Sequence, residues 1–261
     1  MSHKLGQVFL KDQNILDKII ELADIKPTDI VVEIGCGQGW LSKRLADRCH
    51  SLTIIELDPT YLAETQERLS PYTTIQYIHQ DALTVSYDQL HNRPYKIVTN
   101  LPYYISAKFM QKIIHHRDHI THATIMLQDE FAKKLIAPAG SSRYCSLGLY
   151  SQFYYTIDYA FKVSKHCFRP VPKIDSAVIQ CTPRTTPLYT VDEDLFFSIT
   201  KSAFWGRRKP IQSALKKSPF FSWKSAYESL DIWSDLKGKR GETMHLDDFY
   251  YLYQQIANSV S

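Results

Sequence analysis

The amino-acid sequence predicts an α/β domain with a mostly parallel sheet, followed by a small domain made only of helices. Over the first two-thirds of the 261-residue chain, short apolar runs rich in β-branched residues alternate with segments of helical periodicity. A glycine-rich turn follows the first of these runs. After Thr182 the periodicity is helical throughout, without a convincing strand. We therefore expect one domain over 1–183 and a helical one over 184–261.

The expected strands are short runs rich in Val, Ile and Tyr, residues that fit an extended, half-buried chain. They cover Asp29–Ile34, Ser51–Ile55, Thr74–His79, Lys96–Thr99, Ala123–Leu127 and, with weaker patterns, Tyr155–Val163 and Ala177–Cys181. The helices between them are expected at Asn14–Ala23, Trp40–Arg48, Thr60–Leu69, Ala107–His116 and Glu130–Ala137. The first helix has Ile15, Ile19 and Leu22 on one face, which predicts that this face packs on the sheet.

The C-terminal part begins with Pro183–Pro187, whose two prolines predict a linker. Helices are then expected at Asp192–Phe204, Pro210–Lys217, Trp223–Leu230 and Leu246–Ala257. Two stretches, 162–173 and 201–217, contain basic residues and no acid. A solvated face would explain either stretch alone. Together, and interleaved with Phe168, Phe204 and Trp205, they indicate a surface that binds phosphates.

Composition excludes several classes of protein. No apolar stretch approaches the roughly 18 residues that a membrane span requires, and the N-terminus lacks the apolar core of a secretory signal. The five cysteines are odd in number and include no C-x-x-C pair. This pattern argues against a disulfide framework and against a zinc site, so we expect no metal and a cytoplasmic location.

Three expected strands end in residues that suit a nucleoside ligand. The first leads into Glu33-Ile-Gly35-Cys-Gly37-Gln-Gly39, where glycines let the backbone approach a ligand closely. Glu56 ends the second strand, where a carboxylate can bind both ribose hydroxyls, and Asp81 follows the third, within reach of an adenine amino group. The alternative is that both acids only cap the next helices. An adenosine compound without a pyrophosphate, S-adenosylmethionine, fits this pattern best.

The fourth strand ends in Asn100-Leu-Pro-Tyr103. The lone pair of a purine amino group is delocalised into the ring, which makes the nitrogen a poor nucleophile. The Asn100 carboxamide oxygen and a backbone carbonyl near Pro102 would accept its hydrogens and localise the lone pair for attack on a methyl group. Tyr103 would stack on the base. The alternative is a β-turn with a packed tyrosine.

The target base must be unpaired or flipped out of a helix to reach such a pocket. Phe168, in the segment Phe168–Ser176, is a candidate for the second stacking face on that base. From the local sequence, a phenylalanine of the core before a proline-rich turn is an equally good interpretation.

These residues resemble a known family, the ribosomal RNA adenine N6,N6-dimethyltransferases of the bacterial KsgA type. The resemblance covers nearly the whole chain and is carried by Leu5–Leu10, Glu33–Gly39, Ile55–Asp58, Gln80–Ala82, Asn100–Tyr103, Phe168–Ser176 and Ala203–Lys209. It implies a Rossmann-like methyltransferase domain and a helical RNA-binding domain. It further implies dimethylation of two adjacent adenines near the 3′ end of 16S ribosomal RNA, with S-adenosylmethionine as cofactor. The implied partner is an immature small subunit, with no membrane or DNA, and the implied state is a monomer.

The resemblance also implies site residues. Cofactor contacts would fall at Val8, Leu10, Gly35, Glu56, Asp81 and Asn100, with Gly37 in the same glycine turn. The target adenine would lie against Asn100, Leu101, Pro102, Tyr103 and Phe168. Two positions depart from the family, which usually has asparagine where Val8 stands and commonly has asparagine at Tyr104.

Three alternatives are considered. The sister group that methylates an adenine of 23S ribosomal RNA and confers macrolide resistance shares the glycine turn and the Asn100–Tyr103 segment. The amino-acid sequences of Ala203–Lys209 and of 170–177 favour the small-subunit enzyme. A DNA adenine methyltransferase would need a separate sequence-reading domain. A non-catalytic assembly factor would be expected to lose the cofactor acids or Asn100, and all are present.

Overall fold

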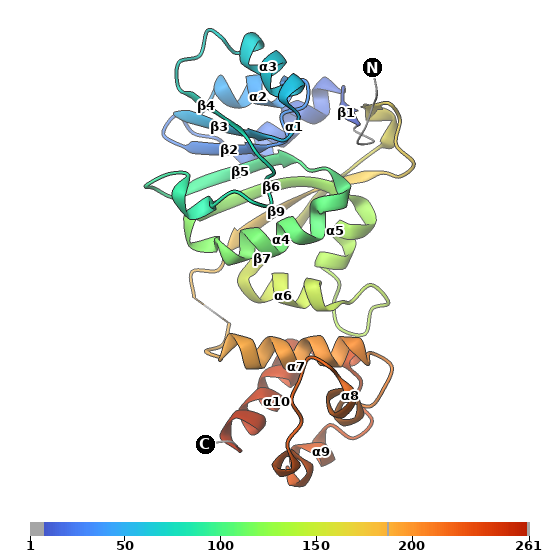
Figure 1. Ribbon diagram of the computed structural model, residues 1–261. Coiled ribbons are helices and arrows are strands. Elements are labelled where there is room, and N and C mark those ends of the chain that lie inside the picture. The colour runs from blue at the N-terminus through green and yellow to red at the C-terminus, as the bar shows by residue number, and fades with distance from the viewer. Residues whose placement is uncertain (1–7, 187, 260–261) are drawn as a thin grey trace. The chain divides into compact units, whose positions relative to one another are not determined.

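The computed structural model describes residues 8–186 and 188–259, which form two compact units (Figure 1). The first unit runs through Ala132 and takes up Tyr155–Pro183 again; the second holds Lys133–Tyr154 and the chain from Arg184 onward. One division therefore falls after Pro183, where a single boundary was expected. The excursion of Lys133–Tyr154 into the second unit was not expected. Leu5–Gln7 and Pro187, named above, lie outside the described residues.

The first unit is built on a seven-stranded sheet with the order β4-β3-β2-β5-β6-β9-β7. Its strands are β2 (Ile30–Ile34), β3 (Ser51–Glu56), β4 (Ile75–His79), β5 (Tyr95–Asn100), β6 (Ile120–Gln128), β7 (Tyr155–Val163) and β9 (Ser176–Pro183). Neighbours from β4 to β6 are parallel, whereas β9 is antiparallel to both β6 and β7. This confirms the predicted α/β fold with a mostly parallel sheet.

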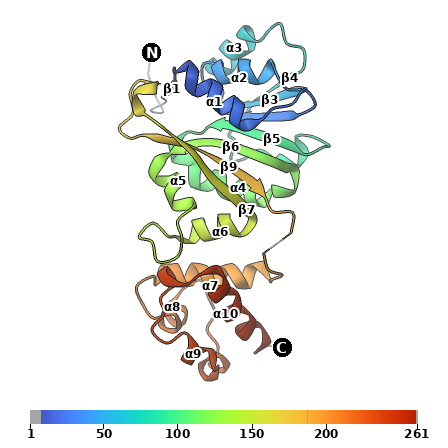
Figure 2. The same cartoon turned by 180° about the vertical axis from the view of Figure 1, so that it is seen from behind.

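Helices cover both faces of this sheet. They are α1 (Gln13–Ala23), α2 (Trp40–Ala46), α3 (Pro59–Arg68), α4 (Ser106–His115) and α5 (Asp129–Leu135). Helix α4 lies on the face turned towards the viewer in Figure 1, and α1 on the face turned towards the viewer in Figure 2. The buried residues of α1 are Leu16, Ile19, Ile20 and Ala23, which pack with strand residues such as Val31 and Ile54 in one core. Ile19 lies on the predicted packing face, whereas Ile15 and Leu22, expected beside it, are only partly buried.

The strand order explains why residues distant in sequence meet. Strands β3, β2 and β5 are adjacent and parallel, so their carboxyl ends lie side by side at one edge of the sheet. The turn after β2 is fixed to the next strand because the Gly35 N–H donates to the Ile55 carbonyl at 2.8 Å. This edge carries the glycine turn, Glu56 and Asn100.

A second, two-stranded sheet closes one side of this edge. Strand β1 (Phe9–Leu10) pairs antiparallel with β8 (Phe168–Arg169), with Leu10 opposite Phe168. The Lys11 N–H extends the ladder by donating to the Cys167 carbonyl at 2.9 Å. Neither strand was predicted, because two residues are too few for a periodic pattern.

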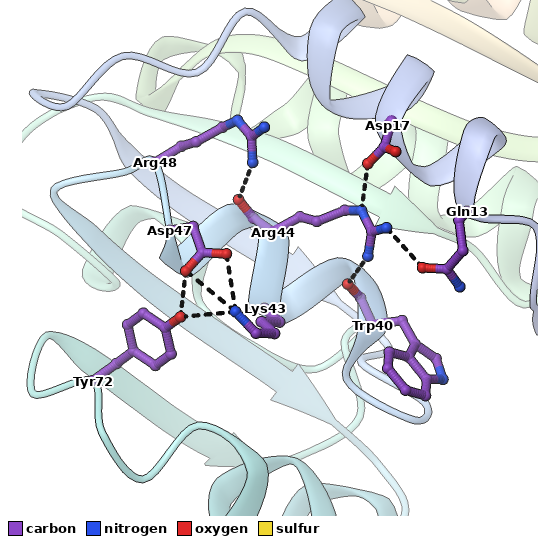
Figure 3. A network of polar contacts seen from close by, with 8 residues as sticks. All are labelled: Gln13, Asp17, Trp40, Lys43, Arg44, Asp47, Arg48 and Tyr72. Carbon is purple, nitrogen blue, oxygen red and sulfur yellow. Dashed lines mark hydrogen bonds and ion pairs between the residues drawn. The ribbon is translucent and has the colours of Figure 1, made fainter.

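Polar contacts fasten α2 to its neighbours (Figure 3). The Arg44 guanidinium donates to Asp17 Oδ1 at 2.7 Å and to Gln13 Oε1 at 2.7 Å, both on α1. It also donates to the Trp40 carbonyl within α2 at 3.2 Å. On another side of α2, Asp47 accepts from the Tyr72 hydroxyl. Helix α2 begins directly after the glycine turn, so these contacts also hold the turn in position.

The second unit is helical, as predicted. It contains α6 (Ser146–Tyr154), α7 (Glu193–Trp205), α8 (Ile211–Lys217), α9 (Ile232–Asp235) and α10 (Leu246–Asn258). The expected helix Trp223–Leu230 is wrong: this stretch contains a 3-10 helix at Ser225–Ser229, and α9 begins only at Ile232. Here the Trp233 indole N–H donates to the Tyr227 carbonyl at 2.5 Å, using a backbone acceptor that a continuous α-helix would need.

Helix α6 was not predicted. It packs on α7 through aromatic rings: the ring centres of Phe153 and Phe196 are 5.2 Å apart, and those of Tyr150 and Phe197 4.5 Å apart. Within the part of the chain that the structure describes, no helix has the length and apolarity that a membrane crossing requires.

Candidate active site

A cavity of about 270 Å³ opens at the carboxyl edge of the sheet in the first unit. Four segments that the sequence singled out line it: the start of β1, the glycine turn, Glu56 at the end of β3, and Asn100–Tyr104 after β5. Nine of the predicted site residues lie on its wall, namely Val8, Leu10, Gly35, Gly37, Glu56, Asn100, Leu101, Pro102 and Tyr103. Asp81 and Phe168 do not line it.

The glycine turn is shaped by backbone conformation and by close packing. Gly35 and Gly37 have φ angles of 73° and 52°, a left-handed conformation that disfavours other residues. A Cβ atom on Gly37 would also lie 3.1 Å from a ring carbon of Phe9. Both effects keep positions 35 and 37 free of side chains where they border the cavity, whereas Cys36 and Gln38 of the same turn also line it.

Glu56 is buried and oriented by backbone donors. Its Oε1 accepts from the N–H groups of Leu57 and Asp58, both at 2.9 Å, and its Oε2 accepts from the Gly37 N–H at 3.3 Å. The carboxylate thus joins the end of β3 to the glycine turn. Both lone-pair sites of Oε1 are used by these backbone donors. Oε2 accepts, besides the Gly37 N–H, only the weak donor Cys36 Sγ at 3.6 Å, so hydrogen bonds from ligand hydroxyls would fall mainly to Oε2.

Asp81 is half-buried after β4. Its Oδ1 accepts from the Leu83 N–H at 2.9 Å, which is the local turn contact considered as the alternative to ligand binding. Its Oδ2 accepts no hydrogen bond from another described residue. The structure therefore shows the structural use of one oxygen and leaves the other for a ligand.

Asn100 ends β5 with its polar group unused. The carboxamide makes no hydrogen bond with another described residue, although the following backbone is fixed. The Leu101 N–H donates to the Met126 carbonyl at 3.0 Å, and the Ile105 N–H to the Pro102 carbonyl at 3.2 Å. Among the described residues nothing donates to the Leu101 carbonyl. An amide oxygen and a backbone carbonyl are thus available at consecutive positions of the cavity wall.

The two tyrosines after Pro102 have different surroundings. The Tyr103 hydroxyl lies 2.7 Å from Ser176 Oγ on β9, which anchors the half-buried ring by its far end. Burial raises the pKa of the Tyr103 phenol, so it stays neutral. Tyr104 is 64% exposed and forms the rim of the cavity.

Phe168 does not occupy the place expected for the second stacking face. Its ring is fully buried in the core with Leu10, Val163 and Val178. The pairing of β8 with β1 turns it inward, behind the wall that Leu10 forms. In this structure Phe168 supports the cavity and offers no surface to a base.

Glu33 is a residue of the cavity that the sequence analysis left without a role. It is fully buried and lines the cavity, and neither carboxylate oxygen has a hydrogen-bond partner among the described residues. Burial raises its pKa to about 8. The sequence did contain an indication of this role, because Glu33 is the one charged residue of the buried strand β2.

The residues that line the cavity indicate which kind of cofactor it can bind. An unpartnered buried carboxyl favours a ligand with positive charge, and Glu56 suits a ribose. The glycines at positions 35 and 37 let a ligand approach the backbone of the turn closely. A positively charged adenosine compound fits these groups. Among the described residues, no cluster of three or more His, Cys, Asp or Glu could hold a metal ion.

Comparisons with known proteins place the chain among ribosomal RNA methyltransferases. The family model described as "Ribosomal RNA adenine dimethylase" matches residues 1–245. The chain is 34% identical to the ribosomal RNA small subunit methyltransferase A of Alkaliphilus metalliredigens, over 98% of this chain and 92% of the relative. A dimethyladenosine transferase of Plasmodium falciparum has a similar structure, with a TM-score of 0.85, 26% identity, and coverage of 97% of this chain and 98% of that one.

The 23S ribosomal RNA methyltransferase ErmE is also similar in structure. Its TM-score is 0.73, with 27% identity, and the match covers 95% of this chain and 99% of that one. ErmE has the lower TM-score of these two structures at nearly equal identity.

Proposed function

The chain belongs to the ribosomal RNA adenine dimethylase family, and on this premise we propose that it dimethylates N6 of two adjacent adenines near the 3′ end of 16S ribosomal RNA. The proposed methyl donor is S-adenosylmethionine, and the proposed substrate is an immature small subunit. One observation carries the proposal. The unpaired carboxamide of Asn100 lies on the wall of the cavity that also holds Glu33, Glu56 and the glycine turn.

Different side chains would bind different parts of the cofactor. Glu56 would hold the ribose hydroxyls, and the free Oδ2 of Asp81 would accept from the adenine amino group. Glu33, with no partner in the cavity, would face the positive end of the ligand. Val8 lines the cavity, but its apolar side chain cannot form a hydrogen bond with the cofactor. When bound, S-adenosylmethionine supplies a sulfonium methyl group open to attack by a nitrogen lone pair.

The residues after β5 would prepare the target. The Asn100 amide oxygen and the Leu101 carbonyl can each accept one hydrogen from the adenine amino group, which draws the nitrogen lone pair out of conjugation. The anchored ring of Tyr103 would stack on the base and hold it in line. Because the amino group of a base inside a duplex is stacked and paired, the target adenine must be unpaired or flipped out of a helix to reach these residues.

The proposal includes the wider assignments. The helical second unit would bind RNA, and the enzyme would act as a monomer. A ribosomal RNA substrate agrees with the expected cytoplasmic location. The large-subunit alternative differs in product, so it can be tested directly.

The test is a methylation assay on both ribosomal subunits. Purified protein would be incubated with labelled S-adenosylmethionine and with subunits that lack this modification, and the RNA digests analysed by mass spectrometry. We expect N6,N6-dimethyladenosine at two neighbouring positions of small-subunit RNA. Label confined to large-subunit RNA would contradict the proposal and favour the alternative.

A further inference from the structure

Among the described residues of the second unit, three large aromatic side chains are exposed, those of Trp205, Phe220 and Tyr251, and the first two lie beside lysines. Trp205, the last residue of α7, is 47% exposed, and Phe220, shortly after α8, is 40% exposed. Other aromatics of this unit, such as Phe196, Phe221 and Phe249, are buried. Exposed rings of this size add little to folding stability, so their position raises the question of a ligand.

Lysines connect these two rings. Lys201 and Trp205 are four residues apart on α7 and so share a face of the helix. The Lys201 ammonium lies 4.0 Å from the centre of the Phe220 ring, and the Lys209 ammonium 5.1 Å from the centre of a Trp205 ring. Ring and cation therefore alternate along the surface. We call these four residues, Phe220, Lys201, Trp205 and Lys209, the aromatic–lysine strip.

The positive charge of the strip is not neutralised by the protein. Within the described residues, neither Lys201 nor Lys209 forms an ion pair with a carboxylate, and residues 195–227 contain no Asp or Glu. Nearby cations differ: Arg207 pairs with Glu242 at 2.9 Å, and Lys216 with Glu228 at 2.7 Å. The two lysines of the strip contact aromatic rings instead, which leaves their charge available to an anion.

We propose that the aromatic–lysine strip binds an unpaired segment of RNA outside the catalytic cavity. Bases would stack on Trp205 and Phe220, and phosphates would pair with Lys201 and Lys209. A nucleotide carries one flat base and one phosphate, so a repeating strand matches an alternation of ring and cation. The choice of RNA as partner rests on the proposed function.

Other partners suit the strip less well. An acidic protein would be recognised by the lysines without any need for exposed rings. A lipid surface would favour a continuous apolar patch, whereas here each ring is flanked by an ammonium group. Binding to a lipid surface is a measurable outcome of the experiment below.

The experiment measures binding of a fluorescently labelled oligouridylate to the full chain by anisotropy. Oligouridylate has no adenine, so this binding does not depend on methyl transfer. We expect Trp205→Ala and Phe220→Ala each to weaken binding about tenfold, the loss expected from one stacked base. Trp205→Phe should retain most of the affinity. Lys201→Gln and Lys209→Gln should each lower the slope of log affinity against log salt by about 0.7.

Tyr251→Ala is the matched control, because Tyr251 is an aromatic residue 42% exposed on α10 and outside the strip. It should bind as the wild type does, and thermal unfolding would confirm that all variants fold. Wild-type affinity in Trp205→Ala and Phe220→Ala, or no binding by the wild type, would overturn the proposal. Trp205-dependent binding to anionic vesicles without binding to oligouridylate would also overturn it.

Methylation separates this inference from the proposed function. With small subunits as substrate, the strip variants should raise KM and leave kcat unchanged, because the strip lies outside the cavity. A wild-type protein that binds oligouridylate through Trp205 but methylates neither subunit would contradict the proposed function alone.

Discussion

At the scale of single residues, Glu33 combines burial, an ionisable group and the absence of a partner. With a pKa of about 8, its carboxyl is mostly protonated at neutral pH when no cation lies beside it. A positively charged ligand would reverse this preference by stabilising the carboxylate. The same residue can therefore be tolerated in the folded core and still attract a cation.

Glu33 predicts a pH dependence of stability. Its pKa in the folded protein lies above its ordinary value of 4.5, so the folded state keeps a proton that the unfolded chain releases. Its contribution to stability is therefore lost as the pH rises from about 4.5 to about 8, by at most about 1.4 kcal/mol per pH unit. Urea unfolding at pH 5.5, 6.5 and 7.5 measures this loss. Glu33→Gln should flatten it, and parallel slopes for variant and wild type would refute the assignment.

Asn100→Ala tests the polarisation of the amino group. Turnover should fall about a hundredfold or more, whereas cofactor affinity should change less than about tenfold, because Asn100 acts mainly on the target nitrogen. Single-turnover methylation and calorimetric titration measure the two quantities. Asn92→Ala, an exposed amide elsewhere in the first unit, is the control. Unchanged turnover in Asn100→Ala would contradict the proposed role.

The positions of the site residues at strand ends could be predicted from the sequence. Gly35, Glu56 and Asn100 follow apolar strands, and a parallel sheet brings such ends to one edge whatever the details of packing. The orientation of Phe168 could not be predicted, because it depends on the pairing of two-residue strands far apart in sequence. The missing partner of Glu33 likewise follows from tertiary packing.

At the scale of elements, α2 is the part that links the cofactor turn to the rest of the first unit. It is only seven residues long, too short to be stable alone, so its contacts with α1 matter. Arg44 provides two of them, to Asp17 and Gln13, and a third hydrogen bond within α2, and its side chain is only 18% exposed. Arg48, one turn further on, donates to a backbone carbonyl at an exposed position.

Arg44→Ala should therefore lower the free energy of unfolding by about 1–2 kcal/mol, because several hydrogen bonds are lost together at a partly buried site. Arg48→Ala should change it by less than about 0.5 kcal/mol. Urea unfolding of both variants provides the comparison. Figure 3 shows the contacts that each substitution would remove. Equal effects of the two substitutions would show that the contacts of Arg44 carry no special weight.

Helix α6 was missed because its local sequence argues against a helix. Helix α6 contains Gly148, which lowers helix propensity; a Cβ there would lie 2.5 Å from the Lys134 carbonyl oxygen. Glycine is thus required by a close tertiary approach, and local propensity points the other way. The long strands and amphipathic helices had no such conflict and were predicted within a few residues.

At the scale of the whole molecule, the catalytic cavity and the aromatic–lysine strip belong to different units. Every residue that lines the catalytic cavity belongs to the first unit, whereas the aromatic–lysine strip belongs to the second. Of the basic stretch 162–173, Lys162 is paired with Asp175 at 2.8 Å. Lys165, Arg169 and Lys173 of that stretch form no ion pair within the described residues, and neither do Lys201, Arg208, Lys209 and Lys217 of the second unit, so both stretches offer charge to RNA phosphates.

Two neighbouring arginines of the second unit should behave differently. Arg208 is exposed and has no ion pair within the described residues, so Arg208→Glu should weaken RNA binding and flatten its salt dependence without changing the unfolding temperature. Arg207→Glu should lower the unfolding temperature, because Arg207 pairs with Glu242 and donates to the Ser142 carbonyl. Anisotropy titrations and thermal unfolding measure the two effects; a reversed pattern would contradict this division of roles.

The route of the chain between the units has a consequence for how such proteins can be recombined. Lys133–Tyr154 leaves the first unit and returns to it, and its aromatic side chains pack on α7. A fragment cut after Pro183 would keep α6 without α7, with Phe153 and Tyr150 open to water. Exchange of the helical unit between relatives by a single gene crossover would therefore yield a mismatched hybrid, and a working chimaera would need the excursion and the C-terminal part transferred together.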